Sequence, residues 1–472
     1  MADSRLNYNP LYLQVKSVLM KRIVDGQHKS GELIPSESKL AQDFGTSVST
    51  IRQALALLVA DGVLVKRQGK GTFVSEREVR LRFLSWMGES PRGEEILGSL
   101  VRKFEEKFPP VKIDIIPSIF PETRSTLMRL ISSGRAPDVA QIVSHWTSYF
   151  ASSGALEPLD ELMSRENLSS RLPAQDLFGG TYKDRVYSVA WGLCPFSLIA
   201  NRHVLREAGI EVPSSPMTLS QFADSCARIS ALPGADAPAA FGLWFTPGVE
   251  TDYLSLYSFL QAFNGEFIDE QGNLRFDSPE NIAGFTWLRD FVAANRIFSS
   301  DIWTIRKRAA ENRIGFFFDG PWIRFLMEEA TGRPFEETFQ VLLAPVQSSA
   351  DSKSWTFNHS LAISAQSENK LYAARFVEAL TNDSELSSWY CSRVGMLPTS
   401  RQLLAAPEFA GEFFSTFREQ LRHSRCLNAQ NPMFEKAMLL CVDAVKKILF
   451  GAVDIGAELA EKQNYLRMLF FD

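Results

Sequence analysis

The pattern of apolar residues changes once along the chain, near residue 77, and this change requires at least two folding units. Before it, apolar residues recur at helical spacing and end in two short runs. After it, short apolar runs typical of strands alternate with amphipathic stretches typical of helices. A length of 472 residues, 45% of them hydrophobic, also exceeds what one core usually supports. We therefore expect a small domain over residues 1–77 and a larger one over residues 78–472.

The small domain is predicted to contain three helices and a β-hairpin. The helices are expected over residues 10–25, 37–44 and 48–60, and Ser36 is a good N-cap for the second of them. Two short apolar runs, 63–67 and 72–74, flank a basic, glycine-containing tip, which is a hairpin signal. Two short helices joined by a tight turn form a helix-turn-helix. The hairpin would then be its wing.

The third helix and the hairpin tip carry side chains that suit duplex DNA. Arginine pairs well with guanine in the major groove, and hydroxyls bond to phosphates or base edges. The DNA-binding residues that we predict are Lys39, Ser49, Thr50, Arg52, Gln53, Arg67, Gln68, Gly69 and Lys70. A protein-interaction module made of three helices and a solvated, charged hairpin would produce a similar pattern. The residues by themselves leave both interpretations open.

Charge and cysteine usage fit a DNA-binding head on an intracellular body. Residues 1–80 hold 12 Lys and Arg against 8 Asp and Glu, whereas residues 81–472 hold 38 against 47. A basic head on an acidic body is expected if only the head meets an acidic polymer. The five cysteines are scattered, which suits free thiols in a reducing compartment. The start of the chain lacks the pattern of a secretory signal, so we expect a cytoplasmic protein without a membrane span.

The ordered matches in the first 75 residues closely resemble the GntR-family winged helix. They are Leu11-Tyr12-Leu13-Gln14-Val15, Ile34-Pro35-Ser36-Glu37-Ser38-Lys39-Leu40-Ala41, Thr50-Ile51-Arg52-Gln53-Ala54-Leu55, Leu58-Val59-Ala60-Asp61-Gly62 and Gly69-Lys70-Gly71-Thr72-Phe73-Val74. The resemblance implies binding to a double-stranded DNA operator, and operator symmetry implies a homodimer. Ser38 and Val48 occupy positions where that family usually has arginine. We therefore expect an operator that differs from the family's usual one.

From Arg80 onward the order of strand, helix and strand repeats. Strands are predicted over residues 81–86, 111–115 and 136–143, with helices over residues 94–108 and 122–133 between them. This order favours an α/β fold with parallel strands, whose ligands lie beyond the carboxyl ends of the strands. The loops after Trp86 and Val143 are therefore the first candidates for a binding site.

Aromatic side chains beside a few polar groups are what a sugar-binding pocket needs, because they stack on the apolar face of the sugar. The ligand-binding residues that we predict are Trp86, Glu89, Ser144, Trp146, Trp191, Asp319, Trp322, Asn358 and His359, with Phe196 and Trp355 as further candidates. Each aromatic residue taken singly would fit the core equally well, since the chain has 9 Trp and 35 Phe.

Six ordered segments resemble the bacterial extracellular solute-binding proteins of the sugar-transporter type. They include Gly134-Arg135-Ala136-Pro137-Asp138-Val139, Gly315-Phe316-Phe317-Phe318-Asp319-Gly320-Pro321-Trp322 and Gly395-Met396-Leu397-Pro398-Thr399. The resemblance implies a type II periplasmic-binding-protein fold with ligand between two α/β lobes. Lobe 1 would span about 80–193 and 358–390, and lobe 2 about 196–350 and 396–472. Three crossing segments are implied, near 193–199, 344–357 and 395–399, and Trp322 matches the family's stacking aromatic.

The combination predicts a transcription regulator that senses a small molecule of the sugar or oligosaccharide class. Two alternatives are an aminotransferase-like domain that binds pyridoxal phosphate, and a transport substrate-binding subunit. The first needs a Schiff-base lysine and a phosphate loop that we cannot place. The second needs an export signal. We expect no enzymatic activity, no cofactor and no metal site, because the five histidines are isolated and no catalytic motif is present.

Overall fold

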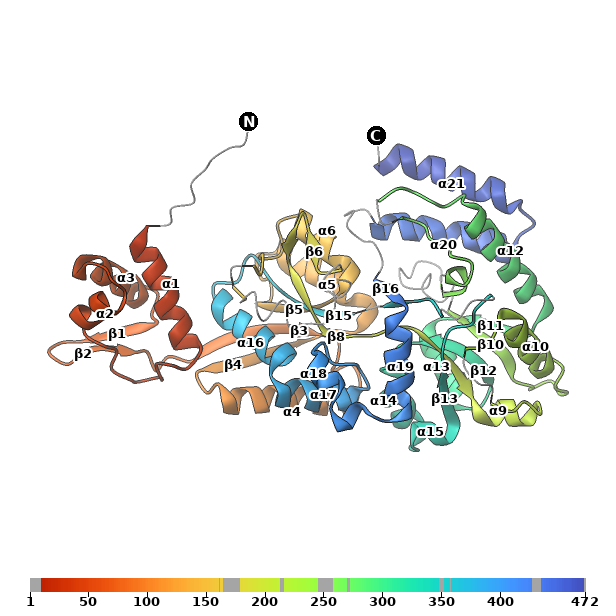
Figure 1. Ribbon diagram of the computed structural model, residues 1–472, viewed down its shortest axis with the longest axis horizontal. Helices are drawn as coiled ribbons and strands as arrows, with labels where there is room; N and C mark the ends of the chain where they lie inside the picture. The colour runs from red at the N-terminus through yellow and green to blue at the C-terminus, as the bar shows by residue number, and fades with distance from the viewer. Residues whose placement is uncertain are drawn as a thin grey trace.

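The computed structural model has a small helical domain at one end of a two-lobed α/β body (Figure 1). It describes residues 10–160, 162–163, 179–212, 216–244, 258–269, 272–347, 352–356, 358–426 and 434–470. Residues 1–9, on which the expected absence of a secretory signal rests, lie outside these ranges. So do residues 348–351 and 357 of the second predicted crossing segment.

The small domain has the winged-helix architecture that its sequence predicts. Its elements are α1 (Leu11–Val24), α2 (Glu37–Asp43), α3 (Val48–Ala60) and the antiparallel strands β1 (Leu64–Arg67) and β2 (Gly71–Val74). Ser36 and Ser47 cap α2 and α3 by accepting hydrogen bonds from Lys39 N and Thr50 N. Buried residues such as Leu40, Ile51 and Leu58 form a core that is separate from that of the body.

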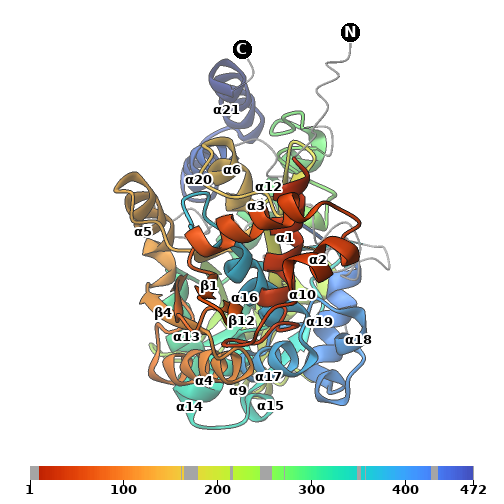
Figure 2. The ribbon, with the colours of Figure 1, turned by 90° about the vertical axis from the view of Figure 1, so that its left-hand side faces the viewer.

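The first lobe is built on a sheet with the strand order β4-β3-β5-β15-β8. Its strands are β3 (Val79–Ser85), β4 (Val111–Pro117), β5 (Val139–Val143), β8 (Ser188–Gly192) and β15 (His359–Ile363). Helices pack on it, namely α4 (Pro91–Lys107), α5 (Phe120–Ser132), α6 (Thr147–Ser152), α16 (Lys370–Asn382) and α17 (Ser384–Val394), together with the 3-10 turn η1 (Ser144–Trp146). The winged helix lies against this lobe, with α1 beside α16 (Figures 1 and 2).

The second lobe is built on a sheet with the strand order β11-β10-β12-β9-β13. Its strands are β9 (Ser197–Asn201), β10 (Ala239–Trp244), β11 (Ile297–Ser300), β12 (Ile314–Asp319) and β13 (Phe339–Leu342). The helices around it are α9 (Arg202–Glu207), α10 (Leu219–Ser230), α12 (Pro279–Ala294), α13 (Ile302–Ala310), α14 (Ile323–Thr331), α15 (Phe335–Thr338), α19 (Glu412–Arg422), α20 (Phe434–Phe450) and α21 (Ile455–Phe470). Smaller elements complete the body: β6 (Thr181–Tyr182), β7 (Arg185–Val186), β14 (Ser354–Thr356), β16 (Ser424–Cys426), α18 (Arg401–Leu404) and η2 (Pro407–Phe409).

Both sheets are mixed, whereas the sequence pattern predicted parallel strands. In the first lobe β3 runs parallel to β4 and β5, but β15 is antiparallel to β5 and β8. In the second lobe β10 runs parallel to β11 and β12, and β9 is antiparallel to β12 and β13. The reason is that β9 and β15 each begin where the chain arrives from the other lobe. The amino end of each of these two strands therefore lies beside the carboxyl ends of the neighbouring strands, which run in the opposite direction.

Three segments connect the lobes, and hydrogen bonds hold them together. Leu193 N donates to Leu397 O at 2.8 Å, which joins the first segment to the third. Phe196 N donates to Trp355 O at 2.8 Å, and Ser354 Oγ donates to Phe196 O at 2.5 Å, which join the first to the second. The link between the lobes is thus a small hydrogen-bonded unit rather than three loose strands of chain.

Within the described residues, no helix combines the length and the apolar character that crossing a bilayer requires.

Candidate ligand cavity and DNA-binding surface

A cavity of about 730 Å³, including space open to solvent, lies between the two lobes. The first lobe contributes the loop after β3, the start of α5 and the start of β15. The second lobe contributes the segment before β9, the end of β10, and residues of α13 and α14. Its lining is Trp86, Met87, Glu89, Ser90, Phe120, Phe196, Trp244, Ile302, Trp303, Arg306, Trp322, Phe325, Leu326 and His359.

Aromatic rings from both lobes meet in this cavity. The Trp322 ring of the second lobe stacks on the His359 imidazole of the first, with centroids 5.2 Å apart and an interplanar angle of 16°. The edge of Trp86 contacts His359 at 5.1 Å, and Phe196 contacts Trp322 at 5.8 Å. Rings arranged in this way offer flat apolar surfaces, which suit the apolar face of a sugar ring.

Burial keeps the His359 side chain neutral, lowering its pKa from 6.5 to about 3. Gln141 Nε2 donates to His359 Nδ1 at 3.3 Å, and Ser85 Oγ donates to Gln141 Oε1 at 2.6 Å. Ser85 holds the side-chain amide of Gln141 in place, and this amide in turn fixes the orientation of the His359 imidazole, whose Nδ1 is the acceptor. The imidazole is consequently a neutral aromatic platform at the working pH.

Arg306 and Asp319 form a two-point ion pair in the second lobe. Arg306 Nε and Nη2 each donate to an Asp319 carboxylate oxygen at 2.8 Å, and Asp319 also accepts from Gly320 N. The guanidinium lies 5.6 Å from the Trp244 ring centroid and 4.9 Å from that of Trp303. Burial raises the pKa of Asp319, and Arg306 opposes that shift.

Glu89 is the other charged group of the lining. One carboxylate oxygen accepts a hydrogen bond from Phe120 N at 3.1 Å. Burial raises the pKa of Glu89, while that hydrogen bond and the more distant Arg306 act against the shift.

The start of α4 and the helix α14 touch across one side of the cavity. Ser90 Oγ donates to Glu329 Oε2 at 2.9 Å, and Arg92 N donates to Glu329 Oε1 at 3.3 Å. Arg92 also lies 3.5 Å from Glu328 and 5.1 Å from the Phe325 ring. A carboxylate of the second lobe thus caps a helix of the first, which favours the approach of the lobes.

The structure brings four of the predicted ligand-binding residues to the cavity wall: Trp86, Glu89, Trp322 and His359. Asp319 lies behind the wall, where it pairs with Arg306. The ring of Trp146 lies 6.4 Å from that of Trp86, outside the lining.

Three more predicted residues lie away from the cavity among the described residues. Trp191 is fully buried in the core and stacks on Tyr390 with centroids 4.2 Å apart. Ser144 N donates to Asn358 O, and Asn358 Oδ1 accepts from Cys194 N. Asn358 therefore ties the second crossing segment to the first.

The sequence reasoning missed Phe120, Trp244, Trp303, Arg306 and Phe325. Trp244 is the last residue of β10, so the rule that ligands lie at strand ends would have found it once that strand was recognised. Trp303 and Arg306 are three residues apart on α13 and so share a helix face. Phe120 and Phe325 lie near the starts of helices and carry no comparable signal.

The predicted DNA-binding residues lie on α2, α3 and the hairpin. All are exposed except Thr50, which is half-buried and bonds through its hydroxyl to Ser47 Oγ at 2.8 Å. Val48 is 37% exposed at the start of α3, so an apolar side chain occupies a place where arginine was expected from the family. The tip residue Gly69 has a φ of +72°, a conformation that favours glycine.

Several of these basic groups already have acidic partners within the domain. Arg52 donates to Glu37 from Nε at 3.1 Å and from Nη2 at 2.9 Å, and Lys39 lies 2.9 Å from Asp43. Arg67 lies 3.4 Å from Glu76. Within the described part of the chain, Lys66 and Lys70 of the wing have no ion-pair partner, so their charge is free to meet phosphate.

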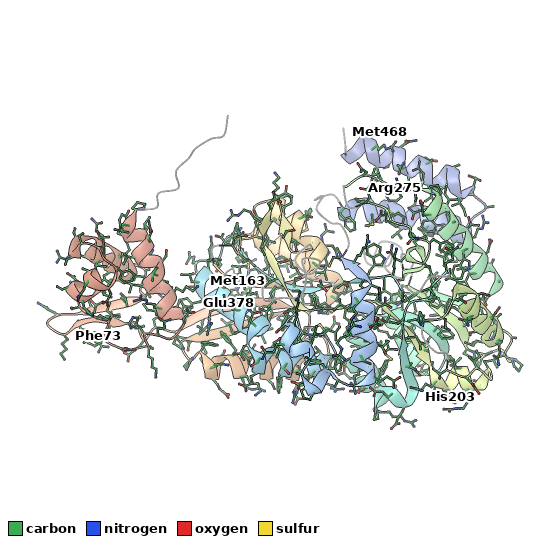
Figure 3. The ribbon with its side chains drawn as sticks, viewed as in Figure 1. Phe73, Met163, His203, Arg275, Glu378 and Met468 are labelled. Carbon is green, nitrogen blue, oxygen red and sulfur yellow. The ribbon has the colours of Figure 1, made fainter. Side chains whose placement is uncertain are left out.

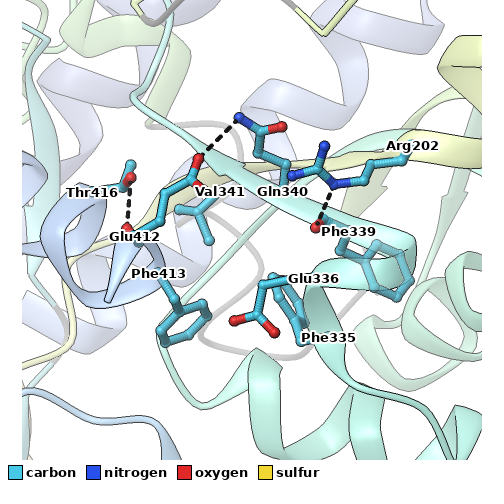
Figure 4. Close-up of a pocket in the computed structure, with 9 residues that line it drawn as sticks. All are labelled: Arg202, Phe335, Glu336, Phe339, Gln340, Val341, Glu412, Phe413 and Thr416. Carbon is cyan, nitrogen blue, oxygen red and sulfur yellow. Dashed lines mark hydrogen bonds between the residues drawn. The ribbon is translucent and has the colours of Figure 1, made fainter. Parts of the chain in front are cut away.

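A smaller depression lies on the second lobe between β13, α15 and α19 (Figure 4). Its polar groups are used internally: Arg202 Nε donates to Phe339 O at 3.2 Å, and Gln340 Nε2 donates to Glu412 Oε1 at 3.5 Å. We assign no ligand to it. Among the described residues, no three His, Cys, Asp or Glu side chains are grouped so that they could hold a metal ion.

The fold and the cavity define a winged helix joined to a two-lobed solute-binding domain. The chain belongs to the bacterial extracellular solute-binding protein family, which matches residues 99–412. Residues 11–74 match the gntR family of bacterial regulatory proteins, so the chain is a fusion of the two.

Relatives of known sequence match the winged helix. A probable fructoselysine utilization operon transcriptional repressor of Escherichia coli is 40% identical over 87 residues, which is 18% of this chain and 36% of that protein. A histidine utilization repressor of Pseudomonas putida is 45% identical over 71 residues, 15% of this chain and 29% of that protein. The chain thus spans about a third of the length of these relatives.

Solved structures match the body. A solute-binding protein of an ABC transporter from Thermotoga lettingae, bound with α-D-tagatose, has a TM-score of 0.75 at 21% identity and covers 84% of this chain and 100% of its own. The GacH receptor of Streptomyces glaucescens, solved without ligand and with acarbose, has a TM-score of 0.73 at 19% identity, with 84% and 99% covered. These likenesses establish the fold of the body.

The pKa of His359 predicts a pH-dependent stability. In the unfolded chain the imidazole gains a proton below about pH 6.5, whereas in the folded chain it stays neutral down to about pH 3. Its contribution to stability is therefore complete above pH 6.5 and falls by about 1.4 kcal/mol for each pH unit below that. The measurement is the free energy of unfolding of the wild type and of His359→Gln between pH 7 and 4. The difference between them should shrink as the pH falls, and a constant difference would contradict the buried neutral imidazole.

Proposed function

We propose that this protein is a DNA-binding transcription regulator whose solute-binding domain senses a sugar or oligosaccharide. The observation that carries the proposal is the pairing of a winged helix with an aromatic-lined cavity between two lobes in one chain. A winged helix serves no purpose outside the cell, so we infer that the sensor acts in the cytoplasm. The described lining of the cavity offers aromatic rings and a few charged groups suited to binding, which supports a sensor.

The mechanism that we propose is closure of the two lobes around the ligand. Ligand that contacts Trp322 and His359 at once binds a closed arrangement better than an open one. A ligand shifts such an equilibrium only by its difference in affinity for the two states. The described residues of the crossing segments near 193–199, 344–357 and 395–399 are then the hinge, and residues 1–77 and 78–472 are the two domains.

Closure of the lobes would change DNA binding through the junction between the winged helix and the first lobe. Only residues 75–78 separate β2 from β3, and Ser75 N donates to Val63 O while Ser30 Oγ donates to Ser75 O. A linker that is this short and is held by hydrogen bonds transmits motion between the two domains rather than absorbing it.

Helix α16 supplies the second contact at this junction. Arg375 on α16 lies 3.9 Å from Asp25 at the end of α1, stacks on Phe108 at 4.6 Å, and lies 3.8 Å from Glu378. Figure 3 labels Glu378 in this region. Helix α16 follows β15, whose first residue is His359 of the cavity. The path from cavity to winged helix is therefore one strand and one helix long.

We further propose that a homodimer binds a palindromic operator through Lys39, Ser49, Thr50, Arg52, Gln53 and the wing residues Arg67 to Lys70. The two-fold symmetry of operators supports the dimer.

Truncation of the stacking aromatic should separate the two activities. Trp322→Ala removes the ring that faces His359, so ligand-induced thermal stabilisation should disappear while ligand-free protein still binds its own promoter DNA with unchanged affinity. Trp389→Ala, a half-buried tryptophan of α17 outside the cavity lining, is the control and should keep the thermal shift. The readouts are a thermal-shift screen with sugars and fluorescence anisotropy with labelled DNA at two salt concentrations. Absence of salt-sensitive DNA binding would contradict the regulator.

Weakening the junction should uncouple ligand from DNA. Arg375→Ala removes the contacts with Asp25 and Phe108, so the ligand should still bind but should change DNA affinity at most half as much, in free-energy terms, as in the wild type. Arg401→Ala, an exposed arginine at the start of α18, is the matched control. Operator affinity is measured for each variant with and without saturating ligand. An undiminished response in Arg375→Ala would remove α16 from the path.

A further inference from the structure

The described lining of the cavity carries one unbalanced negative charge. Its charged side chains are Glu89 and Arg306, and the charge of Arg306 is matched by Asp319 directly behind it. His359 is neutral. Among the described residues, Glu89 therefore determines the charge that a ligand meets in the cavity.

Among the described residues, Arg306 is the cation that acts on Glu89, and it does so from beyond ion-pair distance. Its hydrogen bond comes from the neutral backbone group Phe120 N, and no ion pair joins it to any described residue. The nearest candidate along the chain, Arg92, is engaged with Glu328 and with the Phe325 ring. Glu89 is exposed to solvent in the free protein, although the walls of the cavity crowd it. A ligand that fills the cavity and supplies a positive charge replaces the water on this carboxylate with a charge-assisted hydrogen bond.

The walls around this carboxylate are also suited to a cation. Aromatic residues make up half of the lining: Trp86, Phe120, Phe196, Trp244, Trp303, Trp322 and Phe325. The faces of such rings attract cations, and they do so more strongly where water is excluded. The protein already uses this attraction, since the Arg306 guanidinium lies against both Trp244 and Trp303.

We infer that the ligand is a cationic saccharide, a sugar that carries an ammonium group, with the ammonium on Glu89 and the apolar face of the ring on Trp322. This inference rests on the proposed sugar-sensing function and names its ligand class. It also predicts that sugars bearing phosphate or carboxylate are rejected, because their charge would face Glu89 in a partly dry site.

A neutral sugar offers a competing use of the same carboxylate. Its hydroxyls would donate to the Glu89 oxygens, and an amide at that position would accept them nearly as well. A charged ammonium instead loses its counter-charge when the carboxylate becomes an amide. The substitution Glu89→Gln keeps the shape and the acceptor oxygen and therefore separates the two cases.

The experiment is isothermal titration calorimetry of the full chain with three matched pairs: glucose and glucosamine, galactose and galactosamine, mannose and mannosamine. In at least one pair the amino sugar should bind tenfold or more tightly than its neutral partner. Glu89→Gln should weaken amino-sugar binding by tenfold or more and leave neutral-sugar binding within twofold. Glu95→Gln, an exposed glutamate on α4, is the control and should change neither.

The contrary outcomes are distinct. If neutral sugars bind as tightly as their amino partners, or if Glu89→Gln leaves amino-sugar binding unchanged, the cationic class is overturned while sugar sensing stands. If no member of the three pairs binds the wild type, the cationic class is overturned, and the thermal-shift screen with neutral mono- and oligosaccharides then decides separately whether the protein senses a sugar. A thermal-melting scan of Glu89→Gln checks that the variant is folded.

Discussion

The hydrogen-bonded unit between the lobes is the constraint on which the rest of the structure depends. Leu193 pairs with Leu397, and Phe196 pairs with Trp355, so three stretches of chain cross between the sheets at one place. Because β9 and β15 start from this unit, their first residues face the same space as the ends of β3, β10 and β12. The cavity is a direct consequence of that topology. It has walls from both lobes, and neither lobe forms it alone.

We propose that such a site responds to ligand through its geometry. The stack of Trp322 on His359 and the contact of Ser90 with Glu329 both join one lobe to the other. A ligand that fills the space between them favours the arrangement in which both lobes touch it. The difference in its binding free energy between the closed and open arrangements is the free energy available to reposition the winged helix. The winged helix is well placed to use it, since it rests on α16 and is joined to β3 by a few residues.

Much of the fold could be predicted from the sequence because its signals are local. The caps Ser36 and Ser47 and the glycines of the wing set the winged helix, and the observed bounds of α3 equal the predicted ones. In the body, the repeating strands and helices indicated an α/β fold. The reversed direction of β9 and β15 could not be predicted from the sequence. The direction of a strand in its sheet depends on the lobe from which the chain arrives, and not on the residues of the strand.

The site was less predictable for the same reason. Trp86 and Trp322 follow strands, so the position of strand ends indicated them. Trp191 also ends a buried stretch, yet its ring faces Tyr390 inside the first lobe. Aromatic residues serve both core and cavity, and only the direction of the side chain separates the two. Arg306 and Asp319 form their pair across thirteen residues, a contact that no spacing rule predicts.

We propose that ligand binding in the cavity and DNA binding by the winged helix are coupled within one chain. The most direct measurement is the ligand dissociation constant of the full chain, taken once for free protein and once for protein saturated with operator DNA. Coupling requires these two constants to differ by the same factor by which saturating ligand changes operator affinity, because binding linkage is reciprocal. Equal ligand dissociation constants with and without operator would contradict the account.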